Sequence, residues 1–160
     1  MTAIGTVKSG APAPGEGGRR LRVRHRAVLT LPSRAELVAS VRVFTAGVLH
    51  RWGIGGEEQD TAVLIVDELA ANAVLHGRAD MALLLALDGG TLRITMADSG
   101  ARARAEAPDV PPDEHGRGLG IVGRLADHAE IRPGGSGCRV YVRLRVTPSY
   151  ATVGEPSLAA

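Results

Sequence analysis

Aromatic residues and cysteine are scarce in this chain, and each shortage excludes a class of function. The 160 residues include one phenylalanine, one tryptophan and two tyrosines. A protein that binds single-stranded nucleic acid by base stacking needs more aromatic side chains than these, so we rank that class low. The single Cys138 excludes an intrachain disulfide framework and a cysteine-rich zinc site, which suits a reducing compartment.

The sequence also lacks an excess of one charge and a long apolar run. Its 19 basic and 17 acidic residues give a net charge of +2, too little for capture of a phosphate backbone by charge alone. The arginines between Arg19 and Arg26 form a local basic patch, which we interpret as the solvated face of a strand. The longest apolar runs, such as 81–87, are far below the roughly 18 residues of a membrane span. No secretory signal is visible in the first residues. We therefore expect a cytoplasmic protein with no direct contact to membrane or nucleic acid.

Apolar residues make up 44% of the chain, enough for one hydrophobic core and hence one domain. Residues 1–18 are rich in glycine and proline and have little to bury, and residues 147–160 have the same character. Both ends are therefore predicted to be flexible tails. The folded domain is predicted over 19–146.

Hydrophobic periodicity predicts a strand and then two helices in the first half of this domain. Apolar and arginine residues alternate over 21–29, which is typical of a half-buried strand. Ser33 and Glu36 match a capping box and predict a helix that begins there and ends near Trp52. A second and more apolar helix is predicted over 57–76.

The second half of the domain is predicted to contain two hairpins separated by a loop and a short helix. The hairpin strands are predicted over 81–87 with 91–97 and over 129–132 with 138–146. Residues 99–115 have no periodicity and are expected to form a functional loop resembling a lid. A short helix is expected over 121–128. This order predicts an α/β (α+β) two-layer sandwich, in which a mixed, mainly antiparallel sheet has helices on one face.

A polar stripe runs along the more apolar helix. Glu68, Asn72 and His76 are spaced four residues apart, so they share one helix face and lie about 6 Å apart along its axis. An amide oxygen in a cleft can hold Mg²⁺, and a carboxylate can act as a base. Alternatively, Glu68 and Asn72 face water and the helix dipole favours His76 at the helix end. The spacing alone leaves both interpretations open.

Two glycine-containing segments add further candidates. Asp98-Ser99-Gly100 follows a predicted strand, so its carboxylate either meets a ligand at the sheet rim or caps its own turn. Gly116-Arg117-Gly118-Leu119-Gly120 precedes a helix, where backbone N–H groups and the helix dipole can hold a phosphate. It matches neither a Walker loop nor a dinucleotide-binding loop, because neither the Gly-Lys-Ser/Thr ending nor a preceding strand is present. Arg117 either contacts a terminal phosphate or faces solvent.

The three segments together resemble the motifs of a known superfamily. Residues 68–76 look like the N box of the GHKL, or histidine-kinase-like, ATPases. Residues 98–100 look like their G1 box, and 116–120 like their G2 box. The resemblance covers about 21–146. The form E-x-x-x-N-A-x-x-H-G over 68–77 is most similar to the stand-alone anti-sigma-factor serine/threonine kinases of bacteria.

The resemblance implies a Bergerat-type ATP-binding fold with ATP and Mg²⁺ as cofactors. It implies that Asn72 chelates Mg²⁺, that Asp98 binds the adenine amino group, and that Glu68 is the catalytic base, with Arg117 as a second catalytic candidate. The residues it places around the cofactor are Asn72, His76, Asp98, Gly100, Gly116, Gly118, Leu119 and Gly120. The implied partners are an anti-anti-sigma-like protein substrate and a sigma factor, and the resemblance also implies a homodimer.

Two positions depart from the family pattern. The G1 box usually continues to a further glycine where this chain has Arg102, and the last strand often has threonine near adenine where this chain has Cys138. A second hypothesis is therefore a catalytically degenerate module that works by binding a partner without phosphorylating it. A detached histidine-kinase catalytic domain would need a long dimerising helical hairpin, which the sequence does not predict. Transfer of phosphate to a partner would separate the first two hypotheses.

Overall fold

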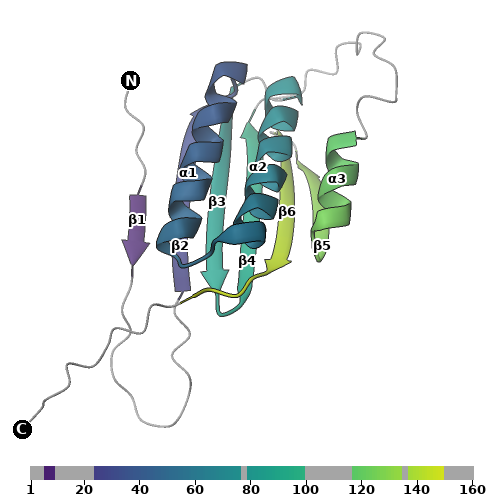
Figure 1. The fold of residues 1–160 in the computed structure, drawn as a ribbon. Coiled ribbons are helices and arrows are strands. Elements are labelled where there is room, and N and C mark those ends of the chain that lie inside the picture. The colour runs from purple at the N-terminus through teal and green to yellow at the C-terminus, as the bar shows by residue number, and fades with distance from the viewer. Residues whose placement is uncertain (1–5, 10–23, 77–78, 100–116, 135–136, 150–160) are drawn as a thin grey trace, which may run out of the picture.

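The computed structural model describes residues 6–9, 24–76, 79–99, 117–134 and 137–149. Figure 1 shows a single sheet with all the labelled helices on one of its faces. The helices are η1 (Ala35–Leu37), α1 (Val38–Arg51), α2 (Gly56–His76) and α3 (Arg117–Leu125). The strands are β1 (Thr6–Ser9), β2 (Arg24–Pro32), β3 (Asp80–Asp88), β4 (Thr91–Ser99), β5 (His128–Gly134) and β6 (Gly137–Arg145).

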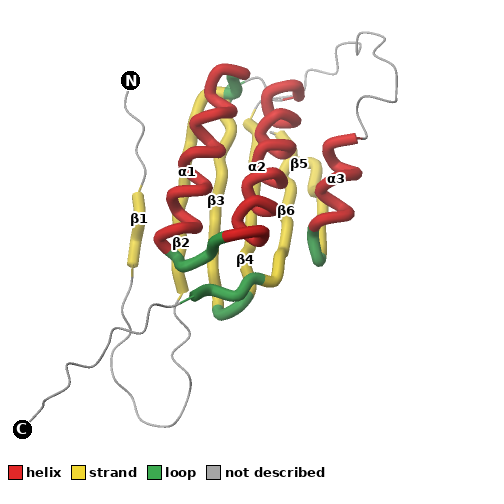
Figure 2. Tube along the Cα trace, viewed as in Figure 1, coloured by secondary structure: helices red, strands yellow, loops and turns green. Residues whose placement is uncertain are grey.

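The strands form one sheet in the order β1-β2-β3-β4-β6-β5. Every pairing in it is antiparallel. Figure 2, coloured by secondary structure, shows the helices forming one layer and the strands the other. The predicted two-layer α/β sandwich with helices on one face is therefore confirmed. The sheet described here is wholly antiparallel, whereas the sequence left room for a parallel pair.

The core lies between the helices and the inner face of the sheet. Strand β3 alternates along its length, with Met81, Leu83, Leu85 and Leu87 buried. Because side chains alternate across a strand, these residues face the helices and their neighbours in sequence lie on the other face. Helix α2 contributes Ile65 and other fully buried apolar residues. Because these apolar residues of α2 face the sheet, its polar residues lie on the side of the helix that faces away from the core.

Helix α1 begins differently from the sequence prediction. Strand β2 runs on to Pro32, and the backbone nitrogen of Ser33 donates to the carbonyl of Ala79 at 2.9 Å. The Ser33 hydroxyl is buried without a hydrogen-bond partner among the described residues, so the predicted capping box is wrong. A short 3-10 turn precedes α1 instead. Pairing of the strand end with its neighbour holds Ser33 away from the cap position.

Helix α3 also begins earlier than expected, at Arg117 instead of Ile121, and ends at Leu125. Gly118 and Gly120 therefore lie inside its first turns. Glycine is less favourable than alanine in a helix by about 1 kcal/mol per residue, so the glycines at 118 and 120 led us to predict a later start for this helix. Packing of Val122, which is buried, against the core outweighs that preference. Strand β5 takes the residues from His128 onward.

The N-terminal segment 1–18, predicted as a tail, contains strand β1, which pairs with β2 over Thr6–Ser9. The rest of that segment lies outside the described residues, as do most of 147–160 and the predicted lid from residue 100 onward. The limits of the domain therefore remain predictions. Among the helices that the structure describes, none combines the length and hydropathy needed to cross a membrane.

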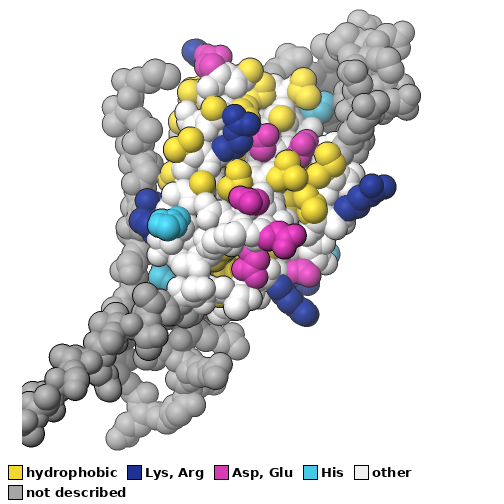
Figure 3. Space-filling view, viewed as in Figure 1, with side chains coloured by type: hydrophobic (Ala, Val, Ile, Leu, Met, Phe, Trp, Pro, Cys, Tyr) yellow, Lys and Arg dark blue, Asp and Glu magenta, His cyan; other side chains and the backbone are white. Residues whose placement is uncertain are grey.

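Helix α2 gives the helix side of the molecule a band of acidic residues. Helix α2 carries glutamates and aspartates but neither lysine nor arginine. In Figure 3, which views this side, acidic side chains run down the middle of the surface between patches of apolar ones. The best-exposed apolar residues on the helices are Val43 and Leu75, at 73% and 75%. The candidate site described next lies on this side.

Candidate functional site

The segments that carry the predicted site residues adjoin one another in the fold. They are the C-terminal half of α2, the end of β4 and the first turn of α3, and α2 contacts both of the others. Helix α2 delivers its polar residues there because its opposite stripe is buried against the sheet. Strand β4 presents Leu92, Ile94 and Met96 to the helices, so by alternation Asp98 belongs to the same face.

Glu68 and Asn72 lie one turn apart on α2 and face the start of α3. A β-carbon built on Gly118 would stand 2.6 Å from Oε2 of Glu68 and 3.5 Å from Nδ2 of Asn72. A residue with a side chain at 118 would thus displace the Glu68 carboxylate. The spacing predicted from sequence therefore brings both side chains to the same place, beside a glycine of the predicted phosphate loop.

The side-chain nitrogen of Asn72 is buried and has no hydrogen-bond partner among the described residues. A buried polar atom without a partner is unusual and calls for an explanation, such as a ligand. The oxygen and nitrogen of an amide exchange places on a flip, so the oxygen can turn to the same point. That point lies at the N-terminal end of α3, where free backbone N–H groups and the helix dipole favour an anion. These residues fit a phosphate group with a bound Mg²⁺.

Asp98 is held by the turn between β5 and β6. The backbone nitrogen of Cys138 donates a hydrogen bond to Oδ1 of Asp98 at 2.9 Å. Gly137 has φ +147°, and a β-carbon there would overlap the backbone of Asp98. The neighbouring strand β6 therefore orients the Asp98 carboxylate. Its Oδ2 accepts no hydrogen bond from the described residues. A fixed carboxylate oxygen at this rim can accept from an amino group.

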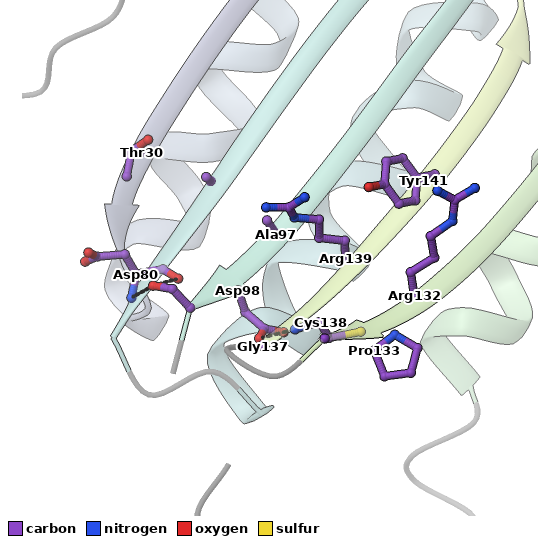
Figure 4. A pocket seen from close by; sticks show the side chains of 13 residues that line it. Thr30, Asp80, Ala97, Asp98, Arg132, Pro133, Gly137, Cys138, Arg139 and Tyr141 are labelled. Atoms are coloured by element: carbon purple, nitrogen blue, oxygen red, sulfur yellow. Dashed lines mark hydrogen bonds between the residues drawn. The ribbon is translucent and has the colours of Figure 1, made fainter. Parts of the chain in front are cut away.

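A hollow of about 600 Å³ lies on the other side of Asp98, at the end of the sheet face that the helices leave open. Figure 4 shows Arg139 and Tyr141 of β6, Arg132 and Pro133 of β5, and Asp98 around it. Neither Glu68 nor Asn72 lines this hollow. We therefore place the candidate site on the helix side, with Asp98 at the boundary between the two regions.

The remaining predicted residues occupy varied positions. His76 is the last residue of α2 and is exposed. Leu119 is half-buried and packs on the core, which makes it a packing residue of α3. A β-carbon on Gly120 would meet nothing within 4 Å. For Arg117 the structure describes only the helical backbone. Gly100, Arg102 and Gly116 lie outside the described residues.

Gly137 is the site residue that sequence reasoning missed. The segment 134–137 was recognisable as a turn between two predicted strands, but only the register shows which residue it touches. The pairing of β4 with β6 brings Ala97 opposite Arg139, and that places the turn against Asp98. Among the described residues, no cluster of His, Cys, Asp and Glu suited to a metal ion is present.

Comparison with known proteins connects this geometry to a family. Residues 31–144 match the model of the histidine kinase-like ATPase domain. Similar proteins include the serine-protein kinase RsbW of Bacillus cereus (strain AH820) and of Bacillus anthracis, each 28% identical over 119 residues. The RsbW of Bacillus mycoides (strain KBAB4) is 26% identical over 119 residues. Each alignment covers 64% of this chain and 74% of the relative. The family match spans most of the sheet and all three α-helices, and the chain belongs to the histidine kinase-like ATPase domain family.

Proposed function

We propose that this protein is an ATP- and Mg²⁺-dependent serine/threonine kinase that regulates transcription through protein partners. Its substrate is a small anti-anti-sigma-like protein, and a sigma factor is its second partner. One observation carries the proposal: Glu68 and Asn72 lie beside Gly118 at the start of α3, and the buried side-chain nitrogen of Asn72 has no hydrogen-bond partner among the described residues. The family and the kinase names of the relatives support it.

Each residue has a distinct role in this proposal. Asn72 holds Mg²⁺, which when bound offsets the negative charge of the phosphates. Asp98, oriented by its bond from Cys138, accepts from the adenine amino group. Gly116, Gly118 and Gly120 leave room for phosphate oxygens at the backbone. Glu68 accepts the proton of the substrate hydroxyl as that oxygen bonds to the γ-phosphorus and ADP leaves.

Arg117 at the first position of α3 is proposed to contact the terminal phosphate, with His76 and Gly100 at the margin of the nucleotide. We further propose that the protein is cytoplasmic and acts as a homodimer.

A second candidate function is partner binding without phosphate transfer. Cys138 favours it, because a thiol is a poorer hydrogen-bonding group than a threonine hydroxyl beside the adenine position. Arg102 favours it too, since a large side chain replaces the second glycine of the G1 box. Such a module would keep the fold and bind its partner, yet label no substrate. Phosphate transfer is thus the observation that separates the two functions.

The test is transfer of the γ-phosphate of labelled ATP to the anti-anti-sigma-like proteins of the same organism, with Mg²⁺ present. The wild-type protein should label one of them on serine or threonine. Glu68→Gln should lower the transfer rate by about 10² to 10⁴ while ATP still binds, because only the proton acceptor is lost. Glu57→Gln, an exposed change on the same helix, is the matched control. ATP binding with no transfer to any candidate would instead favour the partner-binding module.

A further inference from the structure

The sheet face opposite the helices carries a concentration of arginine, and we call it the open face. By the alternation of each strand, its residues are those that do not enter the core. The described strands β2 to β6 each contribute to it. Its exposed arginines include Arg26, Arg93, Arg132, Arg139 and Arg143. None of the described helices covers this face, since all of them lie on the other side of the sheet (Figure 1).

The strand register places like charges directly opposite one another. Arg93 of β4 pairs with Arg143 of β6, and Arg139 of β6 pairs with Arg132 of β5. Side chains in such positions have β-carbons about 4.5 to 5.5 Å apart, and like charges there destabilise a sheet. Within the described part of the chain, Arg26, Arg93, Arg139 and Arg143 have no acidic partner in ion-pair range. Among the described residues, no carboxylate offsets the repulsion between Arg93 and Arg143.

Arg132 differs from the others because it already has a partner. It donates two hydrogen bonds to Glu130, at 2.7 and 3.0 Å, and stacks on the Tyr141 ring at 4.9 Å. The hydrogen bonds from Arg132 lower the pKa of Glu130 below its usual value. Arg132 and Tyr141 lie at one border of the open face.

An apolar stripe separates the two rows of arginine. The register aligns Val28, Leu84, Thr95 and Tyr141 across four strands, and the row ends at Glu130 of β5, the partner of Arg132. Val28 is 42% exposed and the other three are half-buried. One neighbouring row holds Arg26, Arg93 and Arg143, and the row on the other side holds Arg139 and Arg132. Protein–protein interfaces are enriched in tyrosine and arginine and have an apolar centre, and the open face has these features.

We propose that the open face is a docking surface for a protein partner that presents carboxylates on both sides of an apolar patch. Carboxylates would neutralise the arginines that have no acidic partner among the described residues, and the apolar patch would cover Val28 and Leu84. A nucleic acid backbone supplies negative charge but nothing apolar for this stripe. A second copy joined symmetrically through this face would set arginine against arginine. The surface lies across the sheet from Glu68 and Asn72, so the proposal does not rest on phosphate transfer.

A binding measurement with defined probes tests this surface. The probe is a fluorescently labelled helical peptide with leucines along one stripe and glutamates on both flanks. Its control is the same peptide with glutamine in place of each glutamate, and a labelled DNA duplex is the third probe. The full chain is titrated into each, and fluorescence anisotropy is recorded. The variant combines Arg93→Glu and Arg143→Glu, and the matched control combines Arg34→Glu and Arg51→Glu, which are exposed but outside the open face.

The expected result is saturable binding of the glutamate peptide only, weakened about tenfold or more by the Arg93/Arg143 variant. The Arg34/Arg51 variant should bind as the wild type does. No saturable binding, or equal binding by both variants, would overturn the proposal. Tighter binding to the duplex would make the face a nucleic-acid surface instead. Self-association that disappears in the Arg93/Arg143 variant would assign the face to a second copy.

A stability measurement provides an independent test. Arg93→Thr removes one side of a repelling pair and places a residue suited to strands there. Its melting temperature should rise by up to about 4 °C while affinity for the peptide falls. The charge-preserving Arg93→Lys should leave the melting temperature near that of the wild type. A fall in the melting temperature of Arg93→Thr would contradict the repulsion on which the proposal is built.

Discussion

A β-carbon on Gly137 would stand 2.9 Å from Oδ1 of Asp98 and would overlap the backbone of the same residue. These two residues lie on different strands and are far apart in the sequence. Their contact, together with the bond from Cys138 to Asp98, joins the β5–β6 turn to the end of β4. The position of the candidate adenine-binding carboxylate therefore depends on a glycine in a distant hairpin.

Gly137→Ala should lower both stability and nucleotide binding. The residue has φ +147°, which favours glycine, and the added methyl group would push Asp98 away. Such backbone strain costs about 1 to 3 kcal/mol. Chemical denaturation measures the stability, and Gly55→Ala is the control, because a β-carbon there has only a side-chain oxygen at 4.0 Å. Equal stability of Gly137→Ala and wild type would show that the turn does not hold Asp98.

Gly118→Ala should keep the stability of the fold but lower the rate of phosphate transfer. Alanine favours helix over glycine by roughly 0.5 to 1 kcal/mol, so α3 should not be weakened. Its methyl group would displace the Glu68 carboxylate, and such misplacement costs about 10²-fold in rate. Gly123→Ala, on the same helix with nothing within 4 Å, should gain the stability and keep the phosphate transfer rate. Equal transfer by both variants would remove Glu68 from the proposed reaction.

Leu85→Ala should be one of the more damaging single changes to the fold. Leu85 is 0% exposed at the centre of the sheet, facing the helices. Truncation of a buried leucine to alanine typically costs 2 to 5 kcal/mol, through lost burial and the cavity left behind. Leu75→Ala on α2, at 75% exposure, is the control and should change stability by less than about 0.5 kcal/mol. Similar losses for both would contradict the assignment of the core.

The most accurate predictions from sequence were those that depend on periodicity along one element. Glu68 and Asn72 lie four residues apart on a helix, so their common face follows from helix geometry alone. The hairpin strands β3 and β4 were likewise predictable, from the apolar run over 81–87, the alternation over 91–97 and the Gly89-Gly90 turn between them. In these elements the local pattern and the burial in the fold agree, and the predicted positions were correct to within a few residues.

The features that sequence analysis missed depend on contacts between distant segments. Ser33 matches a helix cap locally, but its backbone is held by Ala79. Gly118 disfavours a helix locally, but α3 begins one residue before it, at Arg117, because burial of Val122 stabilises the helix. The pairing of Arg93 with Arg143 is invisible in either strand alone, because a shift of register by one residue would move one arginine to the other face.

The most direct test of the nucleotide site is thermal unfolding with and without ATP and Mg²⁺. At about a hundredfold excess of ligand over its Kd, binding should add roughly 2.7 kcal/mol, which raises the midpoint by about 5 to 11 °C. Asn72→Ala and Asp98→Asn should each reduce that rise, whereas Asp60→Asn, exposed on α2, should not. No rise at millimolar ATP, with the protein folded, would contradict the site built on Glu68, Asn72 and Asp98.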